Sequence, residues 1–441
     1  MSTWRRDYSR RDDVSPSKRH SAARRRLAAA LALVLGAATL TAAVTTALER
    51  PGTGLLALAG LAIALWLAWH GILRRGVKRA LCLTGAVLAI AAVLGMLAER
   101  GLVLELSVVG TGAILSALAV RRAFAPHGSA GGAWKPAPKS RQATLLINPR
   151  SGGGKAERFA IADEARARGV QPLVLDSNGD LQPLACRAIA GGADVLGMAG
   201  GDGSMAVVAD LAAEHGLPFV CIPAGTRNHF ALDLGVDRDD PIGALDAFTD
   251  GVEQRVDLAD VNGRTFVNNV SLGVYALAVH RDAYRGAKLR TLLAVLPDVI
   301  GPTAPTTPVR LTDDLGRSRT DAGIVLVSNN PYAHDRVLGG GTRPRLDSGH
   351  LGIVVLDRPG GHGLRAWSSA AFEVSAASTL SASADGEALT LEPPIRFTIR
   401  PAALRVRISA RHPGLSPSAL LPRRARSTLP RLARIAIRTK G

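Results

Sequence analysis

The sequence predicts an α-helical membrane domain with four transmembrane helices, followed by an α/β domain that continues into a β-rich region. Three observations support this fold class. Four apolar runs of about 20 residues fill the N-terminal third, strand-like and helical segments alternate after residue 142, and short β-like runs dominate from Val256 onward. The chain has 441 residues, of which 47% are hydrophobic, so it is long enough for several domains and too apolar to be disordered.

The four apolar runs are long enough to cross a bilayer as helices. Basic clusters at 24–26, 74–79 and 121–122 alternate with charge-poor turns at 49–52 and 99–101, which predicts that both ends of the helical domain face the cytoplasm. A cleaved signal peptide is the alternative for the first run, but its length and the three matching spans that follow favour a helix that stays. The runs are Leu27–Leu48, Gly54–Leu73, Ala80–Ala98 and Leu102–Val120.

The net charge of +18 is unevenly distributed along the chain. Residues 1–140 carry +13 and residues 401–441 carry +10, which leaves −5 for residues 141–400. A nucleic-acid-binding domain needs its basic residues on the binding surface, so no nucleic-acid partner is expected. We instead expect the basic termini to face an anionic lipid surface. The three cysteines are too few and too scattered for a disulfide scaffold.

A Gly/Pro-rich linker leads into the α/β domain. Helices are expected between the strands, at 156–168, 184–190 and 205–214, and this alternation predicts a parallel sheet. Glycine-rich loops follow three of the strands and therefore meet at the carboxyl edge of the sheet, where such folds bind ligands. The strands are 143–147, 173–175, 194–198 and 218–222, and the loops are Asn148–Lys155, Gly200–Ser204 and Pro223–Asn228.

These loops match neither of the common phosphate-binding patterns. Pro149 and Ala156 replace the Gly and the Ser/Thr of the P-loop, and Glu157 replaces the last Gly of the dinucleotide motif. Backbone amides of glycine-rich loops at helix starts still bind anions well. Three such loops at one sheet edge therefore predict a phosphate site of another type.

In order and spacing, the motifs resemble the diacylglycerol kinase catalytic domain, which bacterial lipid kinases, sphingosine kinases and ceramide kinases share. The resemblance covers about residues 142–410 and includes Val267–Gly273, Gly339–Gly341, Leu346–Gly349 and Ala384–Glu387. It implies a two-lobed fold, with an α/β nucleotide-binding lobe at 142–254, a β-rich lobe at 255–410 and ATP between them. The complete domain order is then a basic N-terminus 1–26, a membrane domain 27–122, a linker 123–141, the two lobes, and a basic tail 411–441.

The resemblance also assigns site residues. Phosphate and nucleotide contacts fall on the first two loops and on Thr226. An acid beside phosphates calls for Mg²⁺ between them, which makes Asp202 the expected metal ligand. Asp347 stands one residue before the position at which related kinases hold a second Mg²⁺. Two interpretations of Asp347 therefore stay open, a ligand of a second metal ion and a residue of a simple turn. The expected ATP-binding residues are Asn148, Pro149, Arg150, Ser151, Gly152, Gly200, Gly201, Asp202, Gly203, Ser204 and Thr226.

Asp385 and Glu387 are the expected catalytic pair. One of them would accept the proton of the acceptor hydroxyl, and the sequence does not say which. In an extended segment both carboxylates would point the same way, whereas by itself Asp-Gly is a common hairpin turn. The resemblance favours the catalytic role.

The sequence thus predicts a multi-pass enzyme of the cell membrane, with its catalytic domain in the cytoplasm, that transfers the ATP γ-phosphate to diacylglycerol or a similar lipid alcohol. The alternatives are an NAD kinase-like enzyme and a non-catalytic nucleotide sensor. The sensor is motivated by Val207, His229 and Ser348, where this chain departs from the family pattern. The acceptor lipid is left open, and so is assembly as a homodimer. The tail is either an irregular basic end or a segment attracted to anionic lipid.

Overall fold

A computed structural model of the chain describes residues 16–72, 76–124, 134–176, 179–273, 309–320, 322–333, 341–357, 363–419 and 425–437. Parts of the expected N-terminal segment 1–26, the linker 123–141 and the tail 411–441 lie outside these ranges. So do Gly339 and Gly340.

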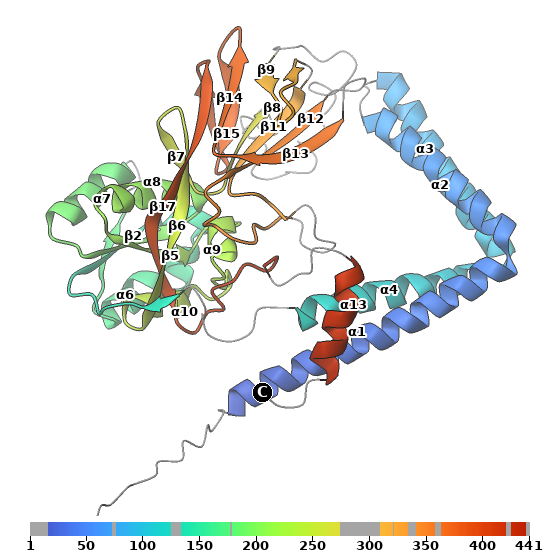
Figure 1. The fold of residues 1–441 in the computed structure, drawn as a ribbon, viewed down its shortest axis with the longest axis horizontal. Coiled ribbons are helices and arrows are strands. Elements are labelled where there is room, and N and C mark those ends of the chain that lie inside the picture. Colours follow the sequence, from blue (N-terminus) through green and yellow to red (C-terminus); the bar gives the residue numbers. More distant parts are fainter. Residues whose placement is uncertain are drawn as a thin grey trace, which may run out of the picture.

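The N-terminal third forms four long helices, α1 (Pro16–Glu49), α2 (Pro51–Ile72), α3 (Gly76–Glu99) and α4 (Val103–Ala123). Each is long and apolar enough to cross a membrane, which confirms four candidate spans. Helix α1 packs against α4 and α2 against α3, and the two pairs meet at an angle (Figure 1). Their direction across the bilayer stays a prediction.

The α/β unit contains four parallel strands in the order β5-β4-β2-β3. Strands β2, β4 and β5 are buried along their whole length, which explains their continuous apolar runs. The expected helix 156–168 is two short helices, because Ala160 takes a left-handed φ of 47° between them. The elements are β2 (Ala143–Ile147), η1 (Ser151–Gly153), α5 (Lys155–Arg158), α6 (Ile161–Ala167), β3 (Gln171–Val174), α7 (Leu181–Ala190), β4 (Val195–Gly200), α8 (Asp202–Glu214), β5 (Pro218–Pro223), α9 (His229–Asp233), α10 (Pro241–Leu245) and η2 (Asp246–Phe248).

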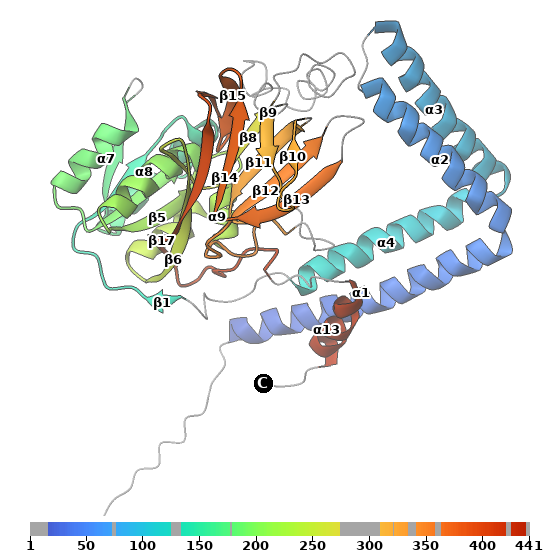
Figure 2. The same ribbon diagram turned by 45° about the horizontal axis from the view of Figure 1, so that its top comes forward.

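The β-rich unit is a sandwich of antiparallel strands. A sheet in the order β13-β12-β11-β8-β15-β16 packs on the antiparallel part of the larger sheet, and one apolar core fills the space between them. Figure 2 shows the sandwich beside the α/β unit. Its strands are β6 (Gly251–Val261), β7 (Arg264–Phe266), β8 (Asn269–Gly273), β9 (Val309–Thr312), β10 (Ser318–Arg319), β11 (Ala322–Asn329), β12 (Leu351–Asp357), β13 (Leu364–Ser369), β14 (Ala371–Ala376), β15 (Leu380–Ala384), β16 (Glu387–Leu391) and β17 (Ile395–Ser409).

Strand β17 joins the two units. Its first half pairs with β14 in the sandwich, and its second half runs parallel to β5 in the α/β unit. The pairing with β6 shifts register between Arg400 and Leu404, where buried Asp257 accepts a hydrogen bond from the Ala402 amide (2.8 Å). The expected fold class is confirmed. The domain boundaries stay predictions, and the one between residues 254 and 255 falls inside β6.

Candidate active site

The three glycine-rich loops lie together at the carboxyl ends of β2, β4 and β5, which are neighbours in the sheet. Asn148 connects the first two loops, because its Nδ2 donates to Ser204 Oγ (3.2 Å) while its Oδ1 accepts from the Arg150 amide (3.1 Å). In the third loop, Asn228 Oδ1 accepts from the Gly225 amide (2.9 Å) and Nδ2 donates to the Gly225 carbonyl (2.9 Å). The loops therefore form one braced cradle.

Glycine is required where the loop backbones touch. Gly152 has a φ of 59°, and a Cβ atom there would overlap the carbonyl oxygen of Ala224. A Cβ atom at Gly225 would lie 2.5 Å from the Cα of Gly201. The first loop thus approaches the third, and the third approaches the second, closely enough for their backbone atoms to touch.

We expect Gly225→Ala to separate the second and third loops, because backbone atoms have no side-chain torsion by which to move away. ATP binding should weaken at least tenfold while the fold persists, which calorimetry on the full chain would measure. Gly153→Ala is the control in the first loop, since a Cβ there meets nothing within 4 Å, and its cost comes only from the left-handed φ of 68°, which Gly225 does not have. Equal losses in the two variants would contradict loop contact as the cause.

Asp202 begins α8 and is buried, with 8% of its surface exposed. Its Oδ2 accepts from the backbone amide of His229 (3.0 Å) and its Oδ1 from that of Phe230 (3.1 Å). The carboxylate therefore caps the start of α9 and ties the second loop to the third. Each carboxylate oxygen retains a lone pair for a further ligand.

Asp385 and Gly386 form a hairpin turn between β15 and β16, with φ values of 50° and 87°. The Asp385 carboxylate is turned inward and accepts from the backbone amides of Val267 (2.9 Å), Asn268 (2.8 Å) and Asn269 (3.1 Å). Burial, and next the nearby charge of Asp202, raise the pKa of Asp385 to about 7, although the three amides favour the charged form.

Glu387 lies on the other side of this turn and is half exposed. A Cβ atom at Gly203 would overlap Glu387 Oε1, so the side chain lies against the start of α8. Its Oε2 accepts from Arg264 Nη2 (2.9 Å). The segment is not extended, so the two carboxylates point in different directions rather than the same way, because two successive left-handed residues reverse the chain between them.

A cleft of about 480 Å³ lies between α8, the residues around β7, and the Asp385 turn. Gly203, Val207 and Asp210 line it from the α/β unit, and Arg264 and Asp385 line it from the sandwich. Gly203 of the second predicted phosphate loop and Asp385 of the predicted catalytic turn thus line one cleft. Val207, a departure from the family pattern, packs on the α/β core at its wall.

The remaining candidates have varied surroundings. Arg150 and Thr226 are exposed at the loop surface, and Pro149 and Ser151 are partly buried. Lys155, the last residue of the first loop, donates from Nζ to the Arg238 carbonyl (2.7 Å). Asp347 forms an exposed ion pair with Arg345 (2.7 Å).

The other two departures from the family pattern are accommodated locally. The Ser348 amide donates to Asn330 Oδ1 (2.8 Å), and the Ser348 hydroxyl contacts the same oxygen. His229 stands at the start of α9, and burial lowers the pKa of its imidazole.

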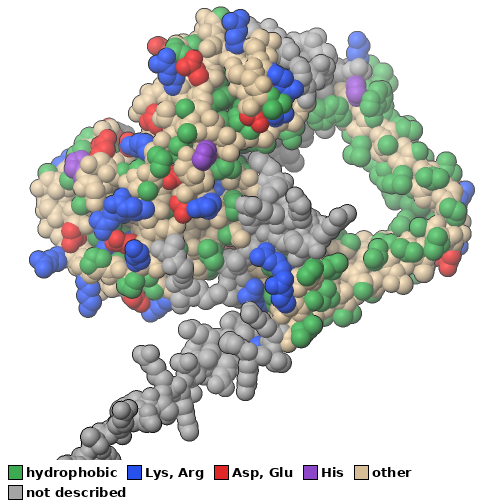
Figure 3. Space-filling view, viewed as in Figure 1, with side chains coloured by type: hydrophobic (Ala, Val, Ile, Leu, Met, Phe, Trp, Pro, Cys, Tyr) green, Lys and Arg blue, Asp and Glu red, His purple; other side chains and the backbone are tan. Residues whose placement is uncertain are grey.

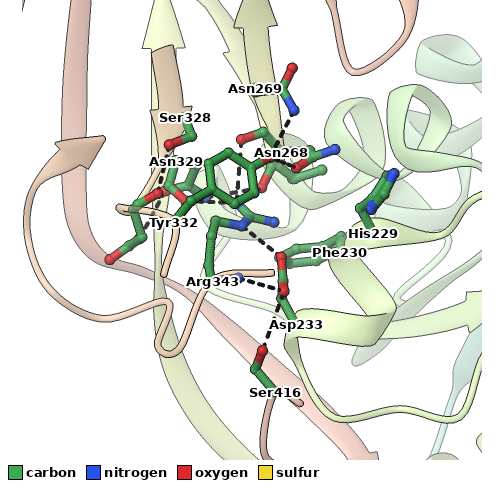
Figure 4. Close-up of polar contacts among 12 residues, drawn as sticks. His229, Phe230, Asp233, Asn268, Asn269, Ser328, Asn329, Tyr332, Arg343 and Ser416 are labelled. Atoms are coloured by element: carbon green, nitrogen blue, oxygen red, sulfur yellow. Dashed lines mark hydrogen bonds and ion pairs between the residues drawn. The ribbon is translucent and has the colours of Figure 1, made fainter. Parts of the chain in front are cut away.

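Sequence reasoning missed a buried ion pair behind the site (Figure 4). Arg343 Nε donates to Asp233 Oδ2 (2.7 Å) at the end of α9, and both side chains are almost completely buried. Arg343 Nη1 also donates to the carbonyls of Val267 (2.7 Å) and Asn329 (2.6 Å). Segment 267–269 is therefore held by Arg343 through a carbonyl and by Asp385 through its amides. An Arg and an Asp 110 residues apart carry no local pattern that would reveal the pair.

Among the described residues, no group of three His, Cys, Asp or Glu side chains is arranged to hold a metal ion by itself. Mg²⁺ commonly binds through one or two carboxylates together with substrate phosphates and water. The donor set here, one buried carboxylate in a phosphate-type loop, fits that mode at Asp202 and does not fit a metal site made of protein alone.

Comparison with known proteins identifies the family. Residues 142–261 match the diacylglycerol kinase catalytic domain. A diacylglycerol kinase of Mycobacterium tuberculosis is 30% identical over 218 residues, which cover 44% of this chain and 71% of the relative. The chain belongs to the diacylglycerol kinase catalytic domain family. It is therefore a lipid kinase, and membership implies the use of ATP.

Two further similarities are with bacterial proteins. A YegS-like lipid kinase of Pseudomonas aeruginosa is 29% identical over 296 residues, which cover 61% of this kinase and 95% of the relative. The crystal structure of a diacylglycerol kinase from Bacillus anthracis is 20% identical with a TM-score of 0.46, over 63% of this kinase and the whole of that chain.

Proposed function

We propose that this kinase transfers the γ-phosphate of ATP to the hydroxyl of diacylglycerol or a closely similar lipid alcohol. The observation that carries the proposal is the shared cleft, in which the phosphate-type loop at Gly203 faces the acid at Asp385. Four apolar helices on the same chain suit an acceptor that stays in the bilayer. The relatives named diacylglycerol kinase support this acceptor.

The roles follow from what phosphoryl transfer requires, namely positioned phosphates, neutralised charge and a base at the acceptor. The backbone amides of the three loops would hold the ATP phosphates. Asp202 would hold Mg²⁺, which when bound neutralises charge on the phosphates. Asp347, paired with Arg345, is the weaker candidate for a second ion.

Asp385 is our candidate for the general base. It lines the cleft, and a pKa of about 7 lets it take a proton at neutral pH. Glu387 would position Arg264 at the mouth of the cleft, through the ion pair between them. We further propose that the catalytic domain faces the cytoplasm at the cell membrane, as the flanking charges predict.

The test is a phosphoryl-transfer assay on purified full-length kinase with labelled ATP, Mg²⁺ and mixed micelles of single acceptors. We expect phosphatidic acid from diacylglycerol, and a loss of at least a hundredfold in Asp202→Asn, because an amide holds Mg²⁺ poorly. Asp210→Asn, an acid on the same helix that lines the cleft away from the loop, is the control. Turnover with sphingosine or ceramide but not diacylglycerol would replace the acceptor, and turnover of NAD alone would overturn the proposal.

A further inference from the structure

The C-terminal tail contains a helix, α13 (Ala425–Ile437), that packs on the membrane helices α1 and α4. Leu432 is buried there, with 3% of its surface exposed, and Ile435 and Ala436 pack beside it. They contact a small apolar cluster that includes Ala28 and Ala29 of α1 and Phe124 after α4. The tail is thus not irregular over this stretch.

The depth of this contact places α13 at the edge of the apolar spans. On α1 it lies within two turns of Arg26, the last charged residue before a run without charge. On α4 it lies beside Arg121 and Arg122, and Arg25 Nε donates to the Ala123 carbonyl (2.8 Å). Figure 3 shows basic side chains gathered at this crossing and hydrophobic side chains along the helices. This depth corresponds to the headgroup layer of a bilayer.

The outward surface of α13 combines two kinds of side chain. Leu429 and Ile437 are 64% and 75% exposed, and Arg431 and Arg434 are exposed near them. Residues 401–441 contain no Asp or Glu, so nothing in the tail neutralises these arginines. Exposed apolar and basic side chains on one helix suit the boundary between acyl chains and anionic headgroups.

The chain connects the helices to the catalytic unit twice, once after α4 and once before α13. The ends of these two connections lie close together. At the catalytic unit, buried Trp134 Nε1 donates to the Gly414 carbonyl (2.8 Å). At the membrane helices, Phe124 and Leu432 belong to one cluster. The two connections therefore start close together at the helices and end close together at the catalytic unit, which makes α13 a second attachment beside α4.

We propose that α13 is an interfacial helix that binds the anionic lipids of the adjacent leaflet through Arg431 and Arg434, and so ties the catalytic unit to the membrane surface at a second point. The bound partner is the anionic bilayer surface. This inference is independent of which lipid alcohol is phosphorylated.

Amide hydrogen exchange in residues 425–437 tests the proposal on the full-length kinase in nanodiscs. We expect exchange on the order of tenfold slower in phosphatidylcholine mixed with phosphatidylglycerol than in phosphatidylcholine alone. Each basic residue near an anionic surface is attracted to it and so stabilises the bound helix. Arg431→Gln with Arg434→Gln should remove this difference. Leu432→Asp should raise exchange in both lipids by detaching α13 from α1.

The matched control is Arg166→Gln with Arg396→Gln, which removes two exposed arginines of the catalytic unit and should keep the full lipid dependence. Equal exchange in the two lipids, or a lipid dependence that survives loss of Arg431 and Arg434, would overturn the proposal. The readout requires no phosphoryl transfer, so its failure is distinct from a failure of the proposed acceptor.

Discussion

Asp385→Asn should lower kcat for phosphoryl transfer by about 10²–10⁴-fold, the usual contribution of a general base. The Asn side chain has nearly the same shape, and Asn tolerates the left-handed φ of 50° at this turn. Its Oδ1 can still accept from the Asn268 and Asn269 amides, while the Val267 amide loses its acceptor because Nδ2 only donates. The change therefore removes proton acceptance and leaves the hairpin in place.

The pH profile gives a second readout of the same group. A base works only when deprotonated, and the pKa of Asp385 is raised to about 7, mainly by burial. We expect kcat/KM to rise about tenfold per pH unit below pH 7 and to level off above it. Burial lowers the pKa of nearby His229, so that side chain would titrate at lower pH. In Asp385→Asn the acid limb near pH 7 should disappear.

Glu387→Gln is the control, because Glu387 is half exposed and lies two residues away in the same hairpin. It should lose the ion pair with Arg264 and retain the acid limb. If Glu387→Gln removes that limb while Asp385→Asn keeps it, the base is Glu387 and our assignment is wrong. Thermal unfolding of both variants establishes that the hairpin remains folded.

Arg343→Met should destabilise the catalytic unit by about 3–5 kcal/mol, because it leaves the buried Asp233 carboxylate without its partner. Burial raises the pKa of Asp233, and the Arg343 guanidinium opposes that rise. Without the guanidinium, the carboxylate must be buried unpaired or take up a proton. The carbonyls of Val267 and Asn329 would lose their donor as well.

Removing both charges should cost less than removing one. In Arg343→Met with Asp233→Leu no charge is left buried alone, so we expect much of the lost stability to return. Thermal unfolding of the four proteins in the cycle, in one detergent, measures the coupling. Additive effects of the two single variants would contradict a direct pair.

Arg343 also affects catalysis indirectly, by positioning the segment that holds Asp385. It fixes the Val267 carbonyl, while the amides of Val267–Asn269 hold Asp385. Arg343→Lys keeps the charge and loses the planar fork. We expect it to lower kcat more than it raises KM for ATP, and to shift the acid limb of the pH profile, which a purely structural role would leave unmoved.

Local sequence patterns predicted the elements whose formation depends on residues that are neighbours in the chain. Apolar runs of about 20 residues, of which only the fourth carries an acid, are long enough to cross a bilayer, and this marks α1–α4 as candidate spans. Glycine-rich loops after apolar strands predicted where β2, β4 and β5 end. The turn at Asp385–Gly386 was readable as a hairpin, since few other dipeptides adopt two positive φ values easily.

The sequence by itself determined the four candidate membrane-spanning helices, the parallel strands and the positions of the glycine-rich loops, because each depends on residues close together in the chain. Only the tertiary structure decided what those parts face. It turned Asp385 toward the amides of 267–269, placed Glu387 against Gly203, and buried Arg343 on Asp233. It also set α13 on α1 and α4. These contacts join residues up to about 400 positions apart, and only packing, which no local pattern records, brings them together.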